Sequence, residues 1–425
     1  MQTEAEAFLA RIRAYPDDDA PRLVFADWLD EQGDPRGAFI RVQLALAQLE
    51  ADEAAAPELG SVGRTDREAN RTRLRTAERE LLVANRTEWE APFGGLAFGL
   101  KFRRGFVEEV NVYARDLVQH GDELFRAGPL RHVHLLNVSG SLAAALQCHY
   151  LGRLAALTIN ASHAGEPLAR AVARSVHLAG LKRLSLRRNR FEDDAAEHFA
   201  ASPTFAAIEE LDLRDNLMSE TGARALAASP HLGSLRRLEL GNNRLGPAGA
   251  EALVVSERLT SLAYLGLAEN EVGAPRLVSL GRAHDLLRVA ILDLSANTFG
   301  PAGLQVILTA PAESAAAMRL YDLDLSHNEL GDDGARVLSR APRLEGLRTL
   351  RLAGCAIGDD GARALAESPH LNQLVRLDLS NNPIDDSGFR EFLRHPSLRV
   401  LDYPAQGLSG PMRLRLDSRF LRSRG

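Results

Sequence analysis

The stretch Ile208-Glu-Glu-Leu-Asp-Leu-Arg-Asp-Asn216 decides the fold, because much of the chain repeats it. The same phrase, opened by leucine, isoleucine or valine and closed by asparagine, recurs at residues 181–189, 235–243, 262–270, 289–297, 320–328 and 374–382. One further copy, residues 347–355, ends in Cys355 instead. Five consecutive copies begin 27 residues apart. A fixed period of this length indicates a solenoid of stacked repeats.

Each repeat divides into a strand half and a helix half. In the pattern Leu-x-x-Leu-x-Leu the leucines alternate with polar residues, which is the period of a short strand. The segments that follow, such as Leu330–Leu338 and Ile357–Leu365, have helical spacing and carry acidic residues in their first turn. Weaker copies at Leu130, Leu154 and Leu398 extend the series to about eleven units.

This pattern resembles the leucine-rich repeat family, and in particular its ribonuclease-inhibitor-like subclass, over roughly residues 130–410. The resemblance implies an α/β solenoid of horseshoe shape, with parallel strands on the concave side and helices on the convex side. The same curvature is expected on physical grounds, because strands stack at about 4.8 Å while packed helices need about 8–10 Å. The period of 27 residues is slightly short for that subclass.

The asparagine that closes each copy is expected to turn inward at the end of its strand. Its amide both donates and accepts hydrogen bonds, so it can satisfy backbone groups of adjacent turns that have no other partner. The expected ladder consists of Asn189, Asn216, Asn243, Asn270, Asn297, Asn328 and Asn382. Cys355 can replace this amide only in part, so we expect a locally weaker turn there.

The amino-terminal residues 1–50 carry three helical patterns, at residues 4–15, 22–31 and 38–50. The run Pro16-Asp-Asp-Asp-Ala-Pro-Arg-Leu-Val-Phe-Ala-Asp-Trp-Leu-Asp-Glu-Gln-Gly-Asp34 resembles the small bacterial repeat-companion domain, which stands at the front of proteins carrying repeats. The resemblance covers roughly residues 4–48 and implies an architecture without known chemistry. Within it, Asp27 is expected to be a half-buried structural acid paired with Arg22, Arg36 or Arg41.

Three further segments complete the expected domain plan. Residues 51–66 are rich in alanine, glutamate, proline and glycine and are expected to form a flexible linker. Residues 67–129 are expected to form a helix, a β-hairpin around Arg103-Arg-Gly105 and a second helix, which together cap the first repeat. The basic tail, residues 411–425, could clasp acidic side chains of the last turn or end in solvent, and we expect the second.

Composition restricts the class of function. Of the 425 residues, 45% are hydrophobic and 25% charged, and the formal net charge is only −6, so no nucleic acid or membrane partner is expected. The start of the sequence lacks the pattern of a secretion signal, and two cysteines cannot build a disulfide framework, so a cytoplasmic location is expected. The sequence has no phosphate-binding loop, no Gly-x-Ser-x-Gly elbow and no His-Glu-x-x-His motif. We therefore expect no enzyme activity and no cofactor.

The polar residues between the strand leucines are expected to form two columns on the concave face. Arginines such as Arg183 and Arg237 make the first half comparatively basic, and aspartates make the later half acidic, interrupted by Arg351 and Arg376. Arg183, Glu210 and Arg237 are expected to form a ladder of alternating charge. The residues expected to bind a protein or peptide partner are Arg183, Arg187, Arg188, Glu210, Asp212, Arg214, Arg237, Glu239, Tyr264, Asp322, Asp324, Arg351, Arg376 and Asp378. Tyr264 is the preferred anchor.

Two other groups of residues could in principle bind a metal ion. The acid pairs Asp332-Asp333, Asp359-Asp360 and Asp385-Asp386 recur at helix starts and are expected to be caps rather than metal ligands. His132, His134 and His149 suggest a metal site, but their spacing matches no established zinc pattern, so no metal is expected.

The repeat subclass also includes activators of Ran-type small GTPases, which makes a GTPase-activating protein the alternative function. No motif of these activators can be placed on this sequence, and the tail here is basic where theirs tends to be acidic. The expected function is therefore a non-enzymatic scaffold that binds a protein or peptide.

Overall fold

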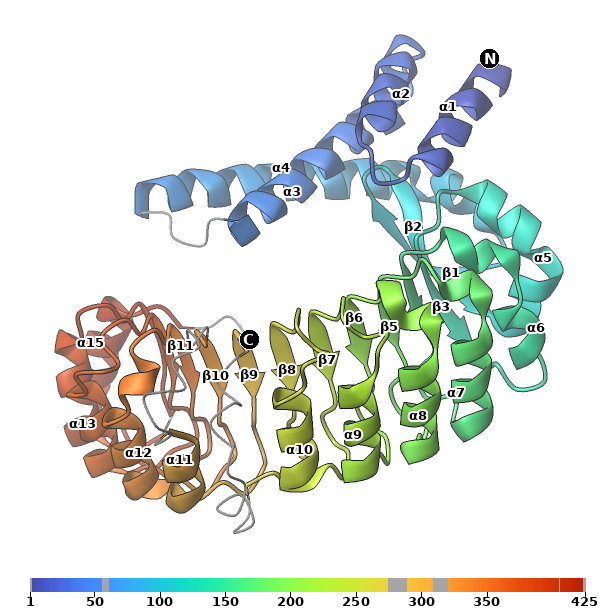
Figure 1. Cartoon of the computed structure of the whole chain (residues 1–425). Coiled ribbons are helices and arrows are strands. Elements are labelled where there is room, and N and C mark those ends of the chain that lie inside the picture. Colours follow the sequence, from blue (N-terminus) through green and yellow to red (C-terminus); the bar gives the residue numbers. More distant parts are fainter. Residues whose placement is uncertain (1, 56–60, 274–288, 309–319, 405, 423–425) are drawn as a thin grey trace. The chain divides into compact units, whose positions relative to one another are not determined.

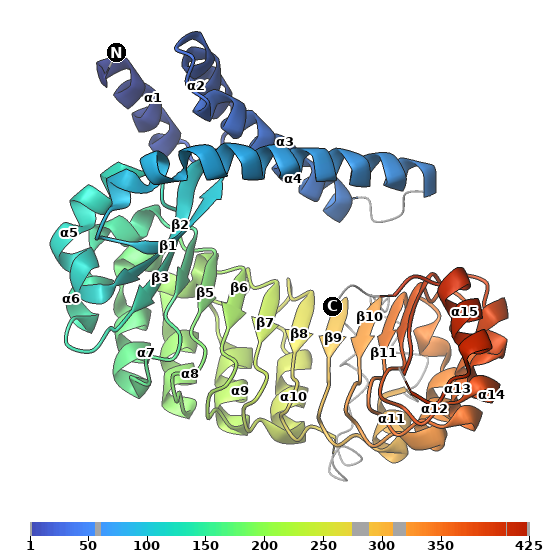
Figure 2. The ribbon, with the colours of Figure 1, turned by 180° about the vertical axis from the view of Figure 1, so that it is seen from behind.

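The computed structural model describes residues 2–55, 61–273, 289–308, 320–404 and 406–422 (Figures 1 and 2). The chain divides into two compact units, Met1–Ile159 and Asn160–Gly425. The first two repeat strands expected from the sequence, near residues 130 and 154, lie in the first of these units, where they continue the sheet of the β-hairpin before them.

Helices form the first part of the N-terminal unit: α1 (Gln2–Ala14), α2 (Ala20–Glu31), α3 (Arg36–Ala55) and α4 (Ser61–Glu90). Pro21 occupies the first turn of α2, where its missing N–H costs nothing. The expected linker at residues 51–66 is helical at both ends, and residues 56–60 lie outside the described residues. Alanine and glutamate are strong helix formers, which explains why α3 continues beyond the expected end at residue 50.

A β-hairpin follows the helices. Strands β1 (Phe98–Arg103) and β2 (Phe106–Tyr113) are antiparallel and are joined through Arg104 and Gly105, both with positive φ. Positive φ at both central residues is the geometry of a type I′ turn, whose twist matches that of the strands. The remaining α-helices and strands of the unit are α5 (Ala114–Ala127), β3 (His132–Leu136), α6 (Leu142–Leu146) and β4 (Ala156–Thr158). Strand β3 pairs in parallel with both β2 and β4.

The first helices pack against the hairpin within this unit. The ring centroids of Phe25 on α2 and Phe106 on β2 are 6.1 Å apart. The fully buried guanidinium of Arg22 donates a hydrogen bond of 2.6 Å to Glu108 Oε1, which is also buried. Asp27 differs from expectation because it is exposed, although it does form an ion pair with Arg41. The buried charge pair of this region is therefore Arg22 and Glu108.

The C-terminal unit is a run of parallel strands in chain order. The strands are β5 (Arg183–Ser185), β6 (Glu210–Asp212), β7 (Arg237–Glu239), β8 (Tyr264–Gly266), β9 (Ile291–Asp293), β10 (Asp322–Asp324), β11 (Thr349–Arg351), β12 (Arg376–Asp378) and β13 (Val400–Asp402). The helices are α7 (Gly165–Arg174), α8 (Asp193–Ala201), α9 (Glu220–Ala228), α10 (Gly246–Val254), α11 (Pro301–Leu308), α12 (Gly331–Ser339), α13 (Asp359–Ala366), α14 (Asp386–Phe389) and α15 (Gly410–Arg419). Helices α7–α13 lie along one side of these strands (Figures 1 and 2).

Burial follows the leucine pattern. The central leucine of each strand, for example Leu211 or Leu238, is buried toward the helices, and the residues on either side of it lie on the opposite face. Alternation with a period of two therefore produces one apolar face and one polar face. The polar face, which the helices of this unit leave uncovered, is called the strand face below.

Acidic residues at the helix starts do act as caps. Asp385 caps its own helix α14, because it accepts a hydrogen bond of 2.7 Å from the Ser387 N–H, whereas Asp332 and Asp359 cap the helix of the following repeat. Asp332 Oδ1, in the first turn of α12, accepts hydrogen bonds from the backbone N–H groups of Gly358 at 2.7 Å and Gly361 at 3.0 Å, at the start of α13. Asp359 in turn accepts from the N–H of Asp385 at 2.8 Å. These contacts join neighbouring repeats on the helix side.

The basic tail does not end in solvent as expected. Residues Gly410–Arg419 form α15, and Met412, Leu416 and Phe420 are buried. Leu421 then pairs with the last strand, because its carbonyl oxygen accepts a hydrogen bond of 2.9 Å from the Leu401 N–H. The apolar residues at helical spacing outweigh the arginines between them, so this segment covers the open edge of β13.

In the described part of the chain, the helices are all too short or too polar to span a lipid bilayer.

Candidate functional site: the strand face of the repeats

The strand face presents two continuous columns of side chains, because consecutive strands pair in a constant register. The first column contains Arg183, Glu210, Arg237, Tyr264, Ile291, Asp322, Thr349, Arg376 and Val400. The second contains Ser185, Asp212, Glu239, Gly266, Asp293, Asp324, Arg351, Asp378 and Asp402. These neighbours are the ones expected from the repeat phase.

The asparagines lie directly beyond the strand ends and join one repeat to the next. Asn297 is typical: its Nδ2 donates to the carbonyl oxygen of Leu267 at 2.7 Å, and its Oδ1 accepts from the N–H groups of Asn270 at 2.9 Å and Val272 at 3.0 Å. Asn189, Asn216, Asn243, Asn270, Asn297, Asn328 and Asn382 are all buried. The amides therefore support the edge of the strand face from inside the repeat.

The first half of the strand face is less basic than expected, because carboxylates neutralise its arginines. Asp215, which lies outside the expected columns, forms ion pairs with Arg187 at 2.9 Å and Arg188 at 3.3 Å. Arg214 pairs with Asp212 at 2.7 Å, and its hydrogen bonds to this carboxylate raise the pKa of the guanidinium. Arg183 is exposed and has no carboxylate within ion-pair distance among the described residues.

The alternating ladder of Arg183, Glu210 and Arg237 does not form. The Arg237 guanidinium pairs instead with Glu239, two residues along its own strand, at 2.5 Å. It also lies over the ring of Tyr264, 3.5 Å from the ring centre. A long arginine side chain reaches several neighbours, and here the buried carboxylate and the aromatic face hold it rather than the exposed Glu210.

A cluster of Arg237, Glu239 and Tyr264 therefore forms near the middle of the described strands, and a glycine makes room for it. A Cβ added to Gly266 would lie 2.1 Å from Glu239 Oε2 and 3.2 Å from Tyr264 Cε1. The cluster occupies the space that a side chain in the second column would fill. Burial and the nearby Glu239 carboxylate raise the pKa of the Tyr264 phenol, so it stays protonated. We call these three residues the aromatic cluster.

The later half of the strand face keeps its acidic character. Arg351 pairs with Asp322 at 2.6 Å and reaches Asp324 at 3.9 Å. Burial raises the pKa of Asp324 above its ordinary value. Arg376 is exposed, and no carboxylate lies within ion-pair distance of it in the described segments. With Asp293, Asp378 and Asp402 added, carboxylates outnumber arginines along β9–β13.

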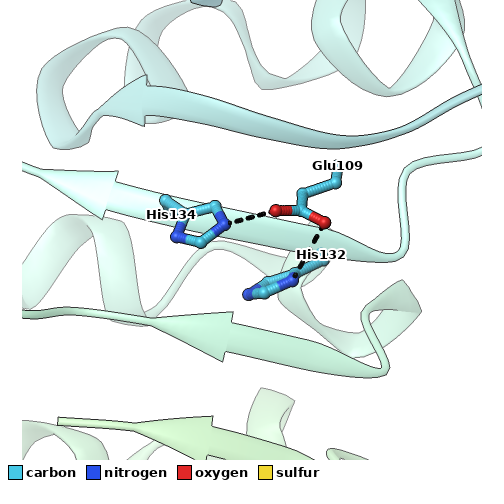
Figure 3. A group of neighbouring side chains, drawn as sticks. All are labelled: Glu109, His132 and His134. Atoms are coloured by element: carbon cyan, nitrogen blue, oxygen red, sulfur yellow. Dashed lines mark hydrogen bonds and ion pairs between the residues drawn. The ribbon is translucent and has the colours of Figure 1, made fainter. Parts of the chain in front are cut away.

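A second polar group lies in the N-terminal unit, and its composition differs from the expected one. His132 and His134 share a face of β3, as their spacing predicts, and Glu109 of β2 lies against both (Figure 3). His134 Nε2 is 2.9 Å from Glu109 Oε1, and His132 Nδ1 is 3.7 Å from Glu109 Oε2. His149 stands apart from this group, with its ring against Tyr150.

Glu109 carries a full negative charge in this group. Although burial alone would raise its pKa, hydrogen bonds from Lys101 and His134 lower the pKa of Glu109 to about 2. Sequence reasoning missed Glu109 because its position beside His132 depends on the register between β2 and β3. The sequence did indicate the two histidines, because His132 and His134 are separated by one residue and therefore lie on the same face of a strand.

The family match to known proteins lies within the C-terminal unit. Residues 231–254, 320–339, 347–366 and 370–392 match the family model of the leucine-rich repeat. This unit therefore contains leucine-rich repeats. No curated protein matches the chain. Among solved structures, the chain is similar to the crystal structure of the Rad7 and Elc1 complex in yeast, with 14% identity over 73% of this chain and 86% of that chain and a TM-score of 0.37. A likeness with so low a TM-score carries no argument about function.

Proposed function

We propose that this leucine-rich repeat chain is a non-enzymatic scaffold whose strand face binds a protein or peptide partner. The observation that carries the proposal is the aromatic cluster, in which Arg237 is fixed between Glu239 and the ring of Tyr264. Tyrosine and arginine contribute most to the free energy of binding at protein interfaces. Side chains that are already held in place lose less conformational entropy when a partner binds.

The constant register supports an extended partner. Columns of side chains on consecutive strands offer equivalent contacts at about 4.8 Å intervals. A segment of a partner that lay across the strands would meet the aromatic cluster first and then the carboxylates of β9–β13. Because these carboxylates outnumber the arginines among them, we propose that the bound segment carries lysine or arginine on one side of an apolar or aromatic residue.

We further propose the finer family assignments. The helices on one side of the C-terminal strands favour the ribonuclease-inhibitor-like subclass and its horseshoe curvature, since helices take more room than strands. The sequence of α2 and the adjoining turns favours a repeat-companion domain at the amino-terminal end. Its packing against the hairpin favours a structural role there, in which it covers the start of the repeats.

Selection from a random peptide library displayed on phage tests this function. The full chain is the target, and synthetic copies of the enriched peptides are then titrated against purified variants. Tyr264→Ala removes the anchor from the strand face. Arg363→Ala is the matched control, because Arg363 is an exposed arginine on helix α13, away from the strand face.

We expect enriched peptides with basic residues, whose affinity falls about tenfold or more in Tyr264→Ala and stays within about twofold in Arg363→Ala. Melting curves of both variants check that they are folded. Peptides that lose affinity only in Arg363→Ala, or a selection without enrichment, would contradict the proposal.

A further inference from the structure

Glu109, His132 and His134 bring three metal-binding side chains together on one face of the N-terminal sheet (Figure 3). One ligand atom from each residue can be chosen so that all of them lie within 4.8 Å of one another. The two histidines are separated by one residue on β3, so both project from the same face, and the register places Glu109 directly beside His132. The imidazole rings are stacked, with centroids 4.2 Å apart.

We propose that Glu109, His132 and His134 bind a divalent transition-metal ion of the zinc class. Two imidazole nitrogens and one carboxylate oxygen form a donor set that such ions prefer. Bonds of about 2.0–2.2 Å in tetrahedral geometry require donor atoms about 3.3–3.5 Å apart. His134 Nε2 is 2.9 Å from Glu109 Oε1, and His132 Nδ1 is 3.7 Å from the other carboxylate oxygen, Oε2. The ligand atoms already lie within 4.8 Å of one another, so rotation of these side chains would bring one carboxylate oxygen and both ring nitrogens around an ion.

The surroundings of His132 already orient it for this role. Its Nε2 lies 2.9 Å from the hydroxyl oxygen of Thr158 on β4, so its Nδ1 is the nitrogen that faces Glu109. A hydrogen bond at the far ring nitrogen of this kind fixes the tautomer and ring orientation of a metal-bound histidine. His132 and His134 are each about one quarter exposed, so solvent reaches the group and a fourth ligand can enter.

Lys101 is the competitor for such an ion. Its ammonium lies 2.5 Å from Glu109 Oε1, and Arg103 lies 3.5 Å from Oε2. A buried carboxylate needs a positive partner, and either an ammonium or a metal ion satisfies it. The side chains of Lys101 and Arg103 are more than 60% exposed on the outer strand β1, so both can move into solvent. Metal binding therefore requires that the Lys101 ammonium leave Glu109, and the free energy of this displacement lowers the affinity for the ion.

Titration of the intact chain with Co²⁺, followed by competition with Zn²⁺, tests the site. Co²⁺ bound by nitrogen and oxygen ligands absorbs visible light, which reports the binding directly. The variants are His132→Gln, His134→Gln, Glu109→Gln and Lys101→Met, and His149→Gln is the control for a nearby histidine outside the group. Melting curves in the absence of metal check that each variant is folded.

We expect about one equivalent of metal bound by the wild type and by His149→Gln, with an affinity at least about tenfold weaker in both ligand histidine variants and in Glu109→Gln. Lys101→Met should bind severalfold more tightly, because the competing ammonium is gone. Absence of stoichiometric binding, or binding that survives replacement of both histidines, would overturn the proposal. An affinity of Lys101→Met equal to that of the wild type would overturn the placement of the ion at Glu109.

Discussion

The thiol sulfur of Cys355 lies 3.2 Å from the carbonyl oxygen of Leu325, where the equivalent position in neighbouring repeats holds an asparagine amide. The thiol donates weakly and has no second donor. The N–H of Leu330 therefore has no asparagine oxygen at position 355 to which it could donate, and it donates instead to the carbonyl oxygen of Asn328 at 3.0 Å. In the next repeat, the equivalent N–H of Ile357 donates to Asn382 Oδ1 at 3.0 Å. The expected weak turn at Cys355 thus corresponds to missing side-chain contacts.

Cys355→Asn is expected to raise the free energy of unfolding by about 0.5–1.5 kcal/mol, because an amide would donate to several carbonyl oxygens and accept from Leu330. Denaturant unfolding of the two proteins measures the change. A lower stability would show that the space around residue 355 has adapted to the smaller thiol.

Asn243→Ala is expected to lower the free energy of unfolding by about 1–3 kcal/mol. Its amide donates to the carbonyl oxygens of Leu213 at 3.1 Å and Leu240 at 2.9 Å and accepts from Met218 N–H at 3.0 Å, and alanine leaves these buried groups unpaired. The adjacent exposed Arg244, changed to alanine, is the control and should shift the value by less than about 0.5 kcal/mol. Equal melting curves for the two variants would refute the structural role of the amide.

Asp332→Ala is expected to lower stability by about 1–2 kcal/mol through loss of the cap on the following helix, α13. Asp333→Ala provides a matched comparison one residue away, because among the described residues Asp333 forms an exposed ion pair with Arg336 and caps no helix of another repeat. Thermal unfolding in the same buffer compares them. A loss in Asp333→Ala as large as that in Asp332→Ala would mean that helix dipole effects, and not the inter-repeat cap, account for the acid pairs.

Because His395 is buried near the carboxyl-terminal end, we expect the free energy of unfolding to depend on pH. The ring is 2% exposed, and burial, with the nearby Arg419, lowers the pKa of His395. The unfolded chain therefore takes up the proton first, so the stability that the neutral ring contributes is present above about pH 6.5 and is lost as the pH falls further.

Unfolding measured between about pH 7.5 and pH 5 should show this loss in the wild type. His395→Asn cannot titrate in this range, and its Oδ1 can accept the hydrogen bond that Leu398 N–H donates to the ring, so its stability should fall less. Parallel pH profiles of the two proteins would assign the loss to other groups.

The GTPase-activating alternative also makes a measurable prediction. We expect that the chain, added to Ran-type small GTPases loaded with GTP, leaves the rate of GTP hydrolysis unchanged. An increase that depends on the concentration of the chain would replace the scaffold proposal with the catalytic one.

The repeat phase predicted the columns of the strand face well, for a physical reason. Strict spacing from Leu181 to Val289 means that equivalent residues must lie side by side once the repeats stack. Tyr264 beside Arg237 follows directly from this rule. The buried asparagines follow from it too, because each occupies the same position of its repeat, where its amide bonds to the backbone of its own and of the preceding repeat.

Side-chain partners could not be obtained from spacing alone. Arg187 and Arg188 both select Asp215 in the following repeat, although spacing offered other carboxylates to them. Long flexible side chains choose among several partners according to burial, which a periodic pattern does not contain. Asp332 likewise caps a neighbouring helix rather than its own, because the helices lie side by side.

The N-terminal unit was harder to predict because it is not periodic before residue 130. The pair of Arg22 and Glu108 joins residues that are 86 positions apart, and Glu109 meets His134 only after β2 and β3 pair. Neither contact has a local signal in the sequence. The types of the secondary-structure elements, by contrast, could be read from helical spacing and from the turn at Gly105.

Site-directed photo-crosslinking tests the central claim most directly. A photoreactive phenylalanine is placed at Ile291, which pairs with Tyr264 on the strand face, or at Arg363 on helix α13, and each protein is irradiated with a peptide enriched in the selection. If the strand face binds the partner, the peptide forms a covalent adduct from position 291 and none from position 363. An adduct from position 363 alone would contradict it.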